Sequence, residues 1–153
     1  MEKDVIISIK GVQRYENADP DTMELVTAGR LEREGNSYTL SYQESELTGL
    51  EGTLTTFQIE PERITLMRVG EFNSQMVFQE GRRHMSMYNT PYGAMTIGVN
   101  TRHLLAELDD HGGNIEIDYC IEVDHAVASL IFRVLMLKRA ELLSEQVPRA
   151  SKR

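Results

Sequence analysis

Arg68 is the polar residue whose position in this sequence most clearly suggests chemistry. It follows Ile64 and Leu66 at alternate positions, so in an extended strand all three side chains point to one face. If that face is buried, the guanidinium needs a partner, because burying an unpaired charge is very costly. Glu44, which shares a strand face with Tyr42, is a candidate for that partner.

The sequence leaves two roles open for Arg68. In the first, Arg68, Tyr42 and Tyr88 bind the acidic head of an amphipathic ligand, since the planar guanidinium fork suits a carboxylate. In the second, Arg68 closes the end of a barrel by bonding backbone carbonyls and Glu44. The cost of burying a charge favours this second, structural role.

Apolar side chains of the central strands would complete a ligand site. Met76 and Phe78 share one face of their strand and extend the polar candidates. The full set of candidate ligand-binding residues is Tyr42, Glu44, Arg68, Met76, Phe78 and Tyr88. A cluster of methionines lies in the same region: Met67, Met76, Met85, Met87 and Met95. Methionine adapts to irregular spaces, so we expect core filling, and a cavity lined by methionines would accept a loosely specified apolar ligand.

Other kinds of chemistry find little support in the residues. The four histidines are spread over residues 84–125 and show no pair at the close spacing of zinc ligands. No nucleophile elbow and no phosphate-cradling glycine-rich loop is present. Carboxylates such as Glu116 and Asp118 alternate as the solvent-facing side of a strand should. We therefore expect no catalytic residue, no metal site and no cofactor.

The elements that must position these residues are strands. From Asn114 to Asp124, polar and apolar residues alternate almost without interruption, which is typical of a half-buried strand. Similar segments recur at 4–14, 22–33, 37–47, 53–60, 63–69, 74–79, 83–89, 94–100 and 127–138. Their short connections exclude parallel crossovers. The pattern predicts an all-β, antiparallel up-and-down meander of about ten strands, closed into a barrel because closure removes exposed edges.

Two segments are predicted to be helical. Leucines recur at helical spacing in residues 101–108, and a threonine can cap the start, so we expect a short helix that plugs a barrel end. Residues 139–145 are predicted to form a second short helix, followed by a disordered end. The expected organisation is one barrel domain over residues 1–138 and a tail over residues 139–153.

Charge and hydropathy restrict the partners and the compartment. The net charge of −8 is uneven, because five basic and two acidic residues give the tail from Lys138 a charge of +3. The acidic body repels nucleic acid and anionic lipid, so we expect neither nucleic acid nor a membrane as partner. No apolar stretch approaches the roughly 20 residues that span a bilayer. The charged start, Met1 to Asp4, does not resemble a signal peptide, and we expect a cytoplasmic protein.

Four motifs in fixed order carry a resemblance to a known family. They are YQESELTGLEGT at 42–53, RVG at 68–70, SQMVF at 74–78 and YNTPYG at 88–93. Together they resemble the YwiB-like family of uncharacterised bacterial β-barrel proteins, over about residues 5–137. That family is grouped with the calycins, alongside lipocalins and fatty-acid-binding proteins. The resemblance implies an up-and-down barrel with an interior cavity, but no particular ligand, and it does not extend to the tail.

Taken together, these features favour a non-enzymatic barrel that binds a small amphipathic or apolar molecule in its lumen, for which a barrel of this size can leave room. The alternative is a protein-interaction module or homodimer without a ligand. That alternative depends on residues 127–137, which are apolar on both faces and could bury against a second copy. An enzyme is the least favoured class.

Overall fold

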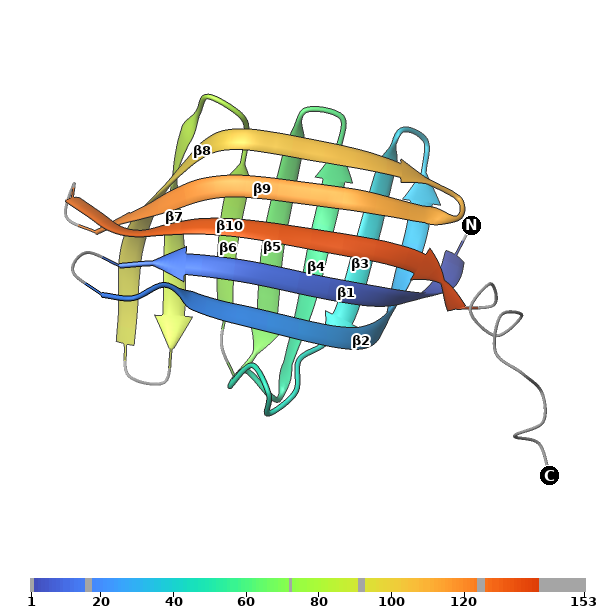
Figure 1. Ribbon diagram of the computed structural model, residues 1–153, viewed down its shortest axis with the longest axis horizontal. Helices are drawn as coiled ribbons and strands as arrows, with labels where there is room; N and C mark the ends of the chain where they lie inside the picture. The colour runs from blue at the N-terminus through green and yellow to red at the C-terminus, as the bar shows by residue number, and fades with distance from the viewer. Residues whose placement is uncertain (1, 16–17, 72, 91–92, 124–125, 141–153) are drawn as a thin grey trace.

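The protein is a closed barrel of ten antiparallel strands (Figure 1). The computed structural model describes residues 2–15, 18–71, 73–90, 93–123 and 126–140. The strands are β1 (Glu2–Arg14), β2 (Asp21–Glu34), β3 (Ser37–Gln43), β4 (Thr53–Glu60), β5 (Arg63–Gly70), β6 (Asn73–Phe78), β7 (Arg83–Thr90), β8 (Gly93–Asp109), β9 (Gly112–Val123) and β10 (Ala126–Arg139). Each strand pairs with its neighbours in sequence, and β1 pairs with β10 to close the ring. The predicted fold class is confirmed.

The barrel is flattened into two layers whose strands cross each other (Figure 1). One layer holds β1, β2, β8, β9 and β10, and the other holds β3 to β7. Two long strands, β2 and β8, connect the layers. Each pairs with a strand of one layer along part of its length and with a strand of the other layer along the rest. Residues 21–32 of β2 pair with β1, and residues 30–34 pair with β3. Alternate residues of one continuous sheet therefore face a shared interior.

The predicted helix at residues 101–108 is wrong, because this segment is part of β8. A β-bulge between Thr101 and His103 shifts the register with β9 by one residue. Inward-facing positions are therefore odd-numbered before the bulge and even-numbered after it, where Leu104 and Leu108 pack against the core. Leu104 and Leu108 are four residues apart, a spacing that one face of a strand shares with one face of a helix.

Two other predicted boundaries differ from the structure. The strand expected over 37–47 ends at Gln43, and a series of turns follows, with Thr48 N donating to Ser45 O and Gly49 N donating to Glu46 O. At the C-terminus, β10 continues to Arg139 and Ala140 is helical, while residues 141–145 of the helix predicted over 139–145 lie outside the described residues.

One half of the interior is filled by apolar side chains. This packed half lies toward the end of the barrel that carries the connections 34–37, 60–63 and 109–112. Its side chains are at most 3 % exposed: Val5, Ile7, Leu31, Leu40, Phe57, Ile59, Ile64, Leu66, Ile115, Ile117, Leu135 and Leu137. Each large side chain buried in this way stabilises the fold by roughly 1.5–3 kcal/mol.

Candidate functional site

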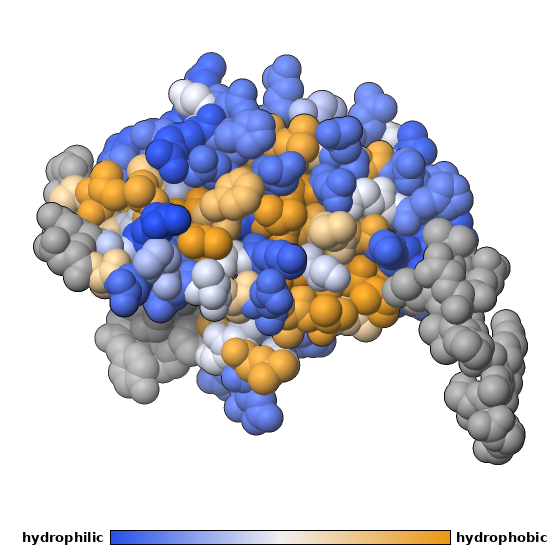
Figure 2. All heavy atoms as spheres, viewed as in Figure 1, coloured by the Kyte–Doolittle hydropathy of each residue, from blue (hydrophilic) through white to orange (hydrophobic). Residues whose placement is uncertain are grey.

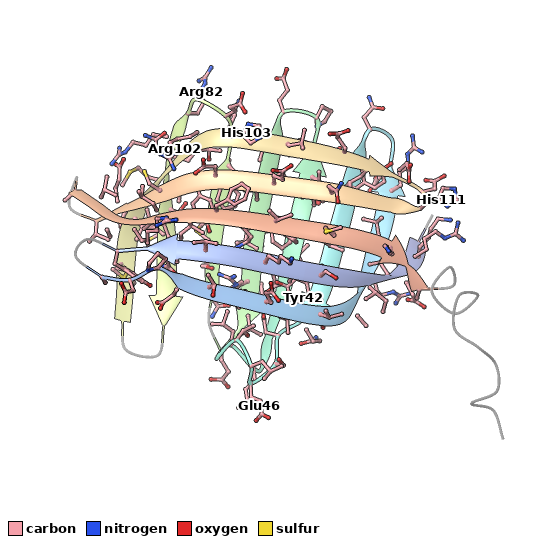
Figure 3. The ribbon with its side chains drawn as sticks, viewed as in Figure 1. Tyr42, Glu46, Arg82, Arg102, His103 and His111 are labelled. Atoms are coloured by element: carbon pink, nitrogen blue, oxygen red, sulfur yellow. The ribbon has the colours of Figure 1, made fainter. Side chains whose placement is uncertain are left out.

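The other half of the interior contains a cavity of about 300 Å³, which we call the lumen cavity. We call this half the hollow half; it lies toward the connections 14–21, 43–53 and 70–73. Its apolar lining includes Ile9, Met23, Leu25, Met76, Ile97, Ile121 and Ile131, and its polar lining includes Gln13, Tyr42, Glu44, Thr48, Arg68 and Arg133. Figure 3 labels Tyr42 within the outline of the barrel and Glu46 on the loop that projects beyond it.

Glu44 occupies a fixed position at the wall of the lumen cavity. Its backbone N–H donates to Thr53 O at 2.9 Å, so the inward row of β3 continues one step past the end of the strand. The Thr55 hydroxyl donates to Glu44 Oε2 at 2.5 Å, and the Thr48 hydroxyl donates to Oε1 at 2.9 Å. The side chain is 2 % exposed. Both carboxylate oxygens therefore accept a hydrogen bond inside the protein.

Arg68 is the cation nearest to that carboxylate. Its Nε lies 3.9 Å from Glu44 Oε2, which is close enough for an ion pair but too long for a hydrogen bond. This Nε is buried and has no hydrogen-bond partner among the described residues, and no bond from Arg68 to a backbone carbonyl is found there. Burial lowers the pKa of the guanidinium, and the positive charge of Arg133 lowers it further. The surrounding residues therefore satisfy only part of the charge and hydrogen-bonding capacity of Arg68.

Arg133 is a second inward-facing guanidinium that the sequence interpretation missed. It lies on the inner face of β10 between Ile131 and Leu135, both of which are buried. Its Nε is buried without a hydrogen-bond partner, and no carboxylate forms an ion pair with it in the described part of the chain. The sequence does contain a feature that could have identified it, because Arg133 is the one charged residue in the apolar run 127–137.

Gly11 leaves free space beside Arg133. It is paired with Arg133 across the β1–β10 ladder and lies on the inward row of β1 between Ile9 and Gln13. A methyl group on the Cα of Gly11 would meet no atom within 4 Å. A recess of about 120 Å³ lies here and shares Gln13 and Arg133 with the lining of the lumen cavity. The absent side chain thus leaves the recess beside Arg133 open instead of relieving a clash.

Tyr42 provides a neutral hydroxyl beside these charges. Burial raises its pKa to about 12, and the negative charge of Glu44 contributes to the rise. The positive charges of Arg133 and Arg68 act in the opposite direction but are weaker. Tyr42 is therefore protonated at neutral pH and acts as a hydrogen-bond donor, and a side-chain hydrogen bond with Glu44 also contributes to the raised pKa.

The structure brings together some of the predicted site residues. The lumen cavity is lined by Tyr42, Glu44, Arg68 and Met76. Phe78 is buried and is not among the residues that line the cavity. Its ring packs against that of Tyr119, with the ring centroids 4.6 Å apart. Tyr88 lies on β7 with its backbone opposite Ser74, and its side chain is outside the described residues.

The methionines mostly do not fill the core. Met76 is 5 % exposed and lines the cavity, but Met85, Met87 and Met95 are 56 %, 57 % and 46 % exposed. For these three residues the prediction of core filling is wrong. Met85 and Met87 lie on the outward side of β7, because they alternate with His84 and the buried Ser86.

Metal-binding clusters and membrane-spanning helices are both absent from the described residues. In that part of the chain, no group of three or more His, Cys, Asp or Glu side chains is arranged to hold a metal ion. Within the same residues, no helix has the length and apolar character needed to cross a bilayer.

The arrangement has the chemistry of an anion site with an apolar floor. Two guanidiniums, Arg68 and Arg133, face one carboxylate, Glu44, so the charged groups of the lining sum to one positive charge. A guanidinium presents several donors in a planar fork that matches the oxygens of an acid group. The neighbouring apolar side chains provide contacts for a hydrocarbon chain.

Comparison with known proteins defines the class of protein. The family model described as "Domain of unknown function (DUF1934)" matches residues 7–131, and the chain belongs to this family. The chain is also similar to the ywiB protein from Bacillus subtilis, whose crystal structure aligns with a TM-score of 0.81 at 21% sequence identity. That alignment covers 91% of this chain and 93% of the other, and supports the resemblance to YwiB-like proteins. No curated protein matches the sequence.

Proposed function

We propose that the barrel binds one small amphipathic molecule in the lumen cavity, with its anionic head at Arg68 and Arg133. The observation that carries the proposal is the pair of buried Nε atoms without a hydrogen-bond partner among the described residues. Buried donors of this kind are normally satisfied, and an unsatisfied one costs about 1–3 kcal/mol. An acid group between the two guanidiniums would accept from both.

The size and lining of the cavity support a small ligand. A volume of about 300 Å³ is at the lower end of the range for small-molecule sites, roughly 300–1,000 Å³. Beyond the arginines, the lining is mainly aliphatic and includes Met23, Leu25 and Ile97. A short hydrocarbon chain would remove these surfaces from water. The implied calycin relationship, in which the barrel interior holds a guest, agrees with this use of the fold.

A matched set of eight-carbon amphiphiles tests the proposal. Octanoate should raise the unfolding temperature, because a ligand that binds only the folded state stabilises it. Native mass spectrometry should show one octanoate per chain. Octanol and octylammonium, which lack the negative charge, should bind more weakly. Equal stabilisation by octanoate and octylammonium, or no complex with octanoate, would contradict the proposal.

The variant Gly11→Val provides a control for the place of binding. Its side chain enters the recess beside Arg133 without meeting another atom at the Cβ position, so folding should be unaffected. Octanoate binding should fall because the space is taken. If the variant binds octanoate as well as the unmodified protein does, the recess beside Arg133 is not part of the ligand site.

Self-association is a second candidate function. Apolar side chains are exposed on the outer faces of β2 and β10, which both pair with β1: Val26 is 67 % exposed, Phe132 is 39 % exposed and Met136 is 45 % exposed. Val26 and Met136 flank Ser8 in one row of paired residues. Figure 2 views this layer and shows hydrophobic residues interspersed with hydrophilic ones. Exposed apolar surface often marks an interface.

Sedimentation of the protein over a wide concentration range tests self-association. A homodimer through this face should dissociate when Phe132 is replaced by Glu, because a charge would be buried at the interface. A monomer at every concentration would exclude this second function and leave the first untouched.

A further inference from the structure

Glu44 reduces the positive charge of the head-group site in a way that a purely anion-binding site does not need. Of the charged side chains that line the lumen cavity, Arg68 and Arg133 carry two positive charges and Glu44 carries one negative charge. Without Glu44 the site would attract an anion more strongly. Its presence therefore calls for a reason other than attraction.

Hydrogen bonds hold the Glu44 carboxylate in place at the wall of the lumen cavity. Hydroxyl donors from Thr48 and Thr55 occupy both of its oxygens, at 2.9 and 2.5 Å, and a guanidinium lies against one of them. The carboxylate accepts from the two hydroxyls, and the guanidinium of Arg68 places a positive charge beside it. The side chain is also almost completely enclosed, so water does not screen its charge.

We propose that Glu44 is a specificity-determining residue that limits the head group of the ligand to a single negative charge. The ligand class is then an alkyl monocarboxylate, and alkyl phosphates are excluded. This inference rests on the proposed function, namely binding of an amphiphile in the lumen. A monoanion neutralises the net positive charge of Arg68, Arg133 and Glu44, whereas a phosphate dianion leaves one negative charge uncompensated and buried, which is costly.

The other charges near the site do not alter this balance. Asp21 borders the adjoining recess, but it is exposed, so water and salt screen it. Glu46 follows two residues after Glu44 on the same loop and projects away from the barrel in Figure 3. Glu46 thus offers a matched control, since replacing it changes the net charge of the protein equally.

The experiment compares octanoate with octyl phosphate at about pH 8, where a phosphate monoester carries close to two negative charges. Calorimetric titration gives both dissociation constants for the unmodified protein, for Glu44→Gln and for Glu46→Gln. The unmodified protein should bind octanoate at least about tenfold more tightly than octyl phosphate, the scale of one close charge pair. In Glu44→Gln this ratio should fall by about tenfold or invert, and in Glu46→Gln it should stay unchanged.

The outcomes separate the two proposals. If the unmodified protein binds both ligands equally, the inference about Glu44 is wrong while binding in the lumen stands, and this test needs no variant to fold. An unchanged ratio in Glu44→Gln would likewise overturn the role of Glu44. Binding of neither ligand by the unmodified protein would contradict the proposed function itself.

Discussion

The two halves of the barrel interior are built from the same strands but filled differently. In the packed half, inward positions hold residues such as Phe57 and Leu66, which are completely buried. In the hollow half, the same rows continue with Tyr42, Arg68 and Arg133 around a cavity. The strands continue with the same alternation, so the fold does not require the cavity. The comparison indicates that the packed half supplies stability, and the hollow half has the space that the proposed binding needs.

Two glycines show the difference within neighbouring strands. A methyl group on Gly29 would lie 2.6 Å from Ile7 Cδ1 and 2.7 Å from Ser41 O, so the packed half needs glycine there. A methyl group on Gly11 would meet nothing within 4 Å. Glycine weakens a strand, because it has no side chain to pack. At Gly11 no packing constraint compensates for that cost, which agrees with a need for open space.

The largest expected effect is from truncating a side chain of the packed half. Phe57→Ala should lower the free energy of unfolding by about 3–5 kcal/mol, because it removes buried surface and leaves a cavity. Leu25→Ala, on the wall of the lumen cavity, should cost less than half as much, because its side chain already borders empty space. Urea unfolding monitored by circular dichroism measures both. Equal losses would contradict the division into two halves.

Substitution of Gly29 should give the next largest loss of stability, and Gly11 provides the comparison. Gly29→Val should destabilise the protein by roughly 1–3 kcal/mol, as overpacking does. Gly11→Val should stay within about 0.5 kcal/mol of the unmodified protein. The same denaturation measurement checks both variants. A strongly destabilised Gly11→Val would show that the recess beside Arg133 is not free space.

Tyr42 should make the hollow half sensitive to alkaline pH. Its pKa is about 12 in the folded protein and close to its ordinary value of 10.0 when unfolded, so above pH 10 the unfolded state releases this proton first. Its contribution to stability is complete below pH 10 and is lost as the pH rises toward 12, by about 1.4 kcal/mol per pH unit. Tyr42→Phe should lose less stability than the unmodified protein between pH 10 and 11. If the free energy of unfolding fell equally with pH in the two proteins, the raised pKa of Tyr42 would be contradicted.

The smallest expected change in stability is a slight increase, on replacement of Arg133. Arg133→Met should leave stability unchanged or raise it by up to about 1 kcal/mol, because an incompletely satisfied buried charge is replaced by an apolar side chain. Octanoate binding should be lost at the same time. The thermal unfolding temperature and a binding titration check these two expectations. A large loss of stability would assign Arg133 a structural role.

The sequence predicts the barrel and part of the hollow half for a clear physical reason. Alternation of polar and apolar residues is a local signal, so it identifies ten strands and places Arg68 and Glu44 on inward faces. It fails just after the bulge between Thr101 and His103, where the leucines at 104, 105 and 108 have a spacing that also fits a helix. These errors change the boundaries of elements but not the order of the strands.

The rest of the site depends on information that a local pattern does not contain. Alternation places Arg133 on one of two apolar faces, but only closure of the ring, with β10 against β1, turns that face toward Arg68. The role of Gly11 is also invisible in the sequence, because it depends on what is absent around it. The ten-stranded register was needed to bring these residues together.

The central claim is that the hollow half holds the acid group of one guest between two guanidiniums. It is tested most directly by nuclear magnetic resonance of octanoate labelled with carbon-13 at its carboxyl carbon. The account predicts a separate signal from bound octanoate that stays at its ionised position when the pH is lowered past the titration of free octanoate, and that disappears in Arg133→Met. A single signal that titrates like free octanoate in the presence of the protein would contradict it.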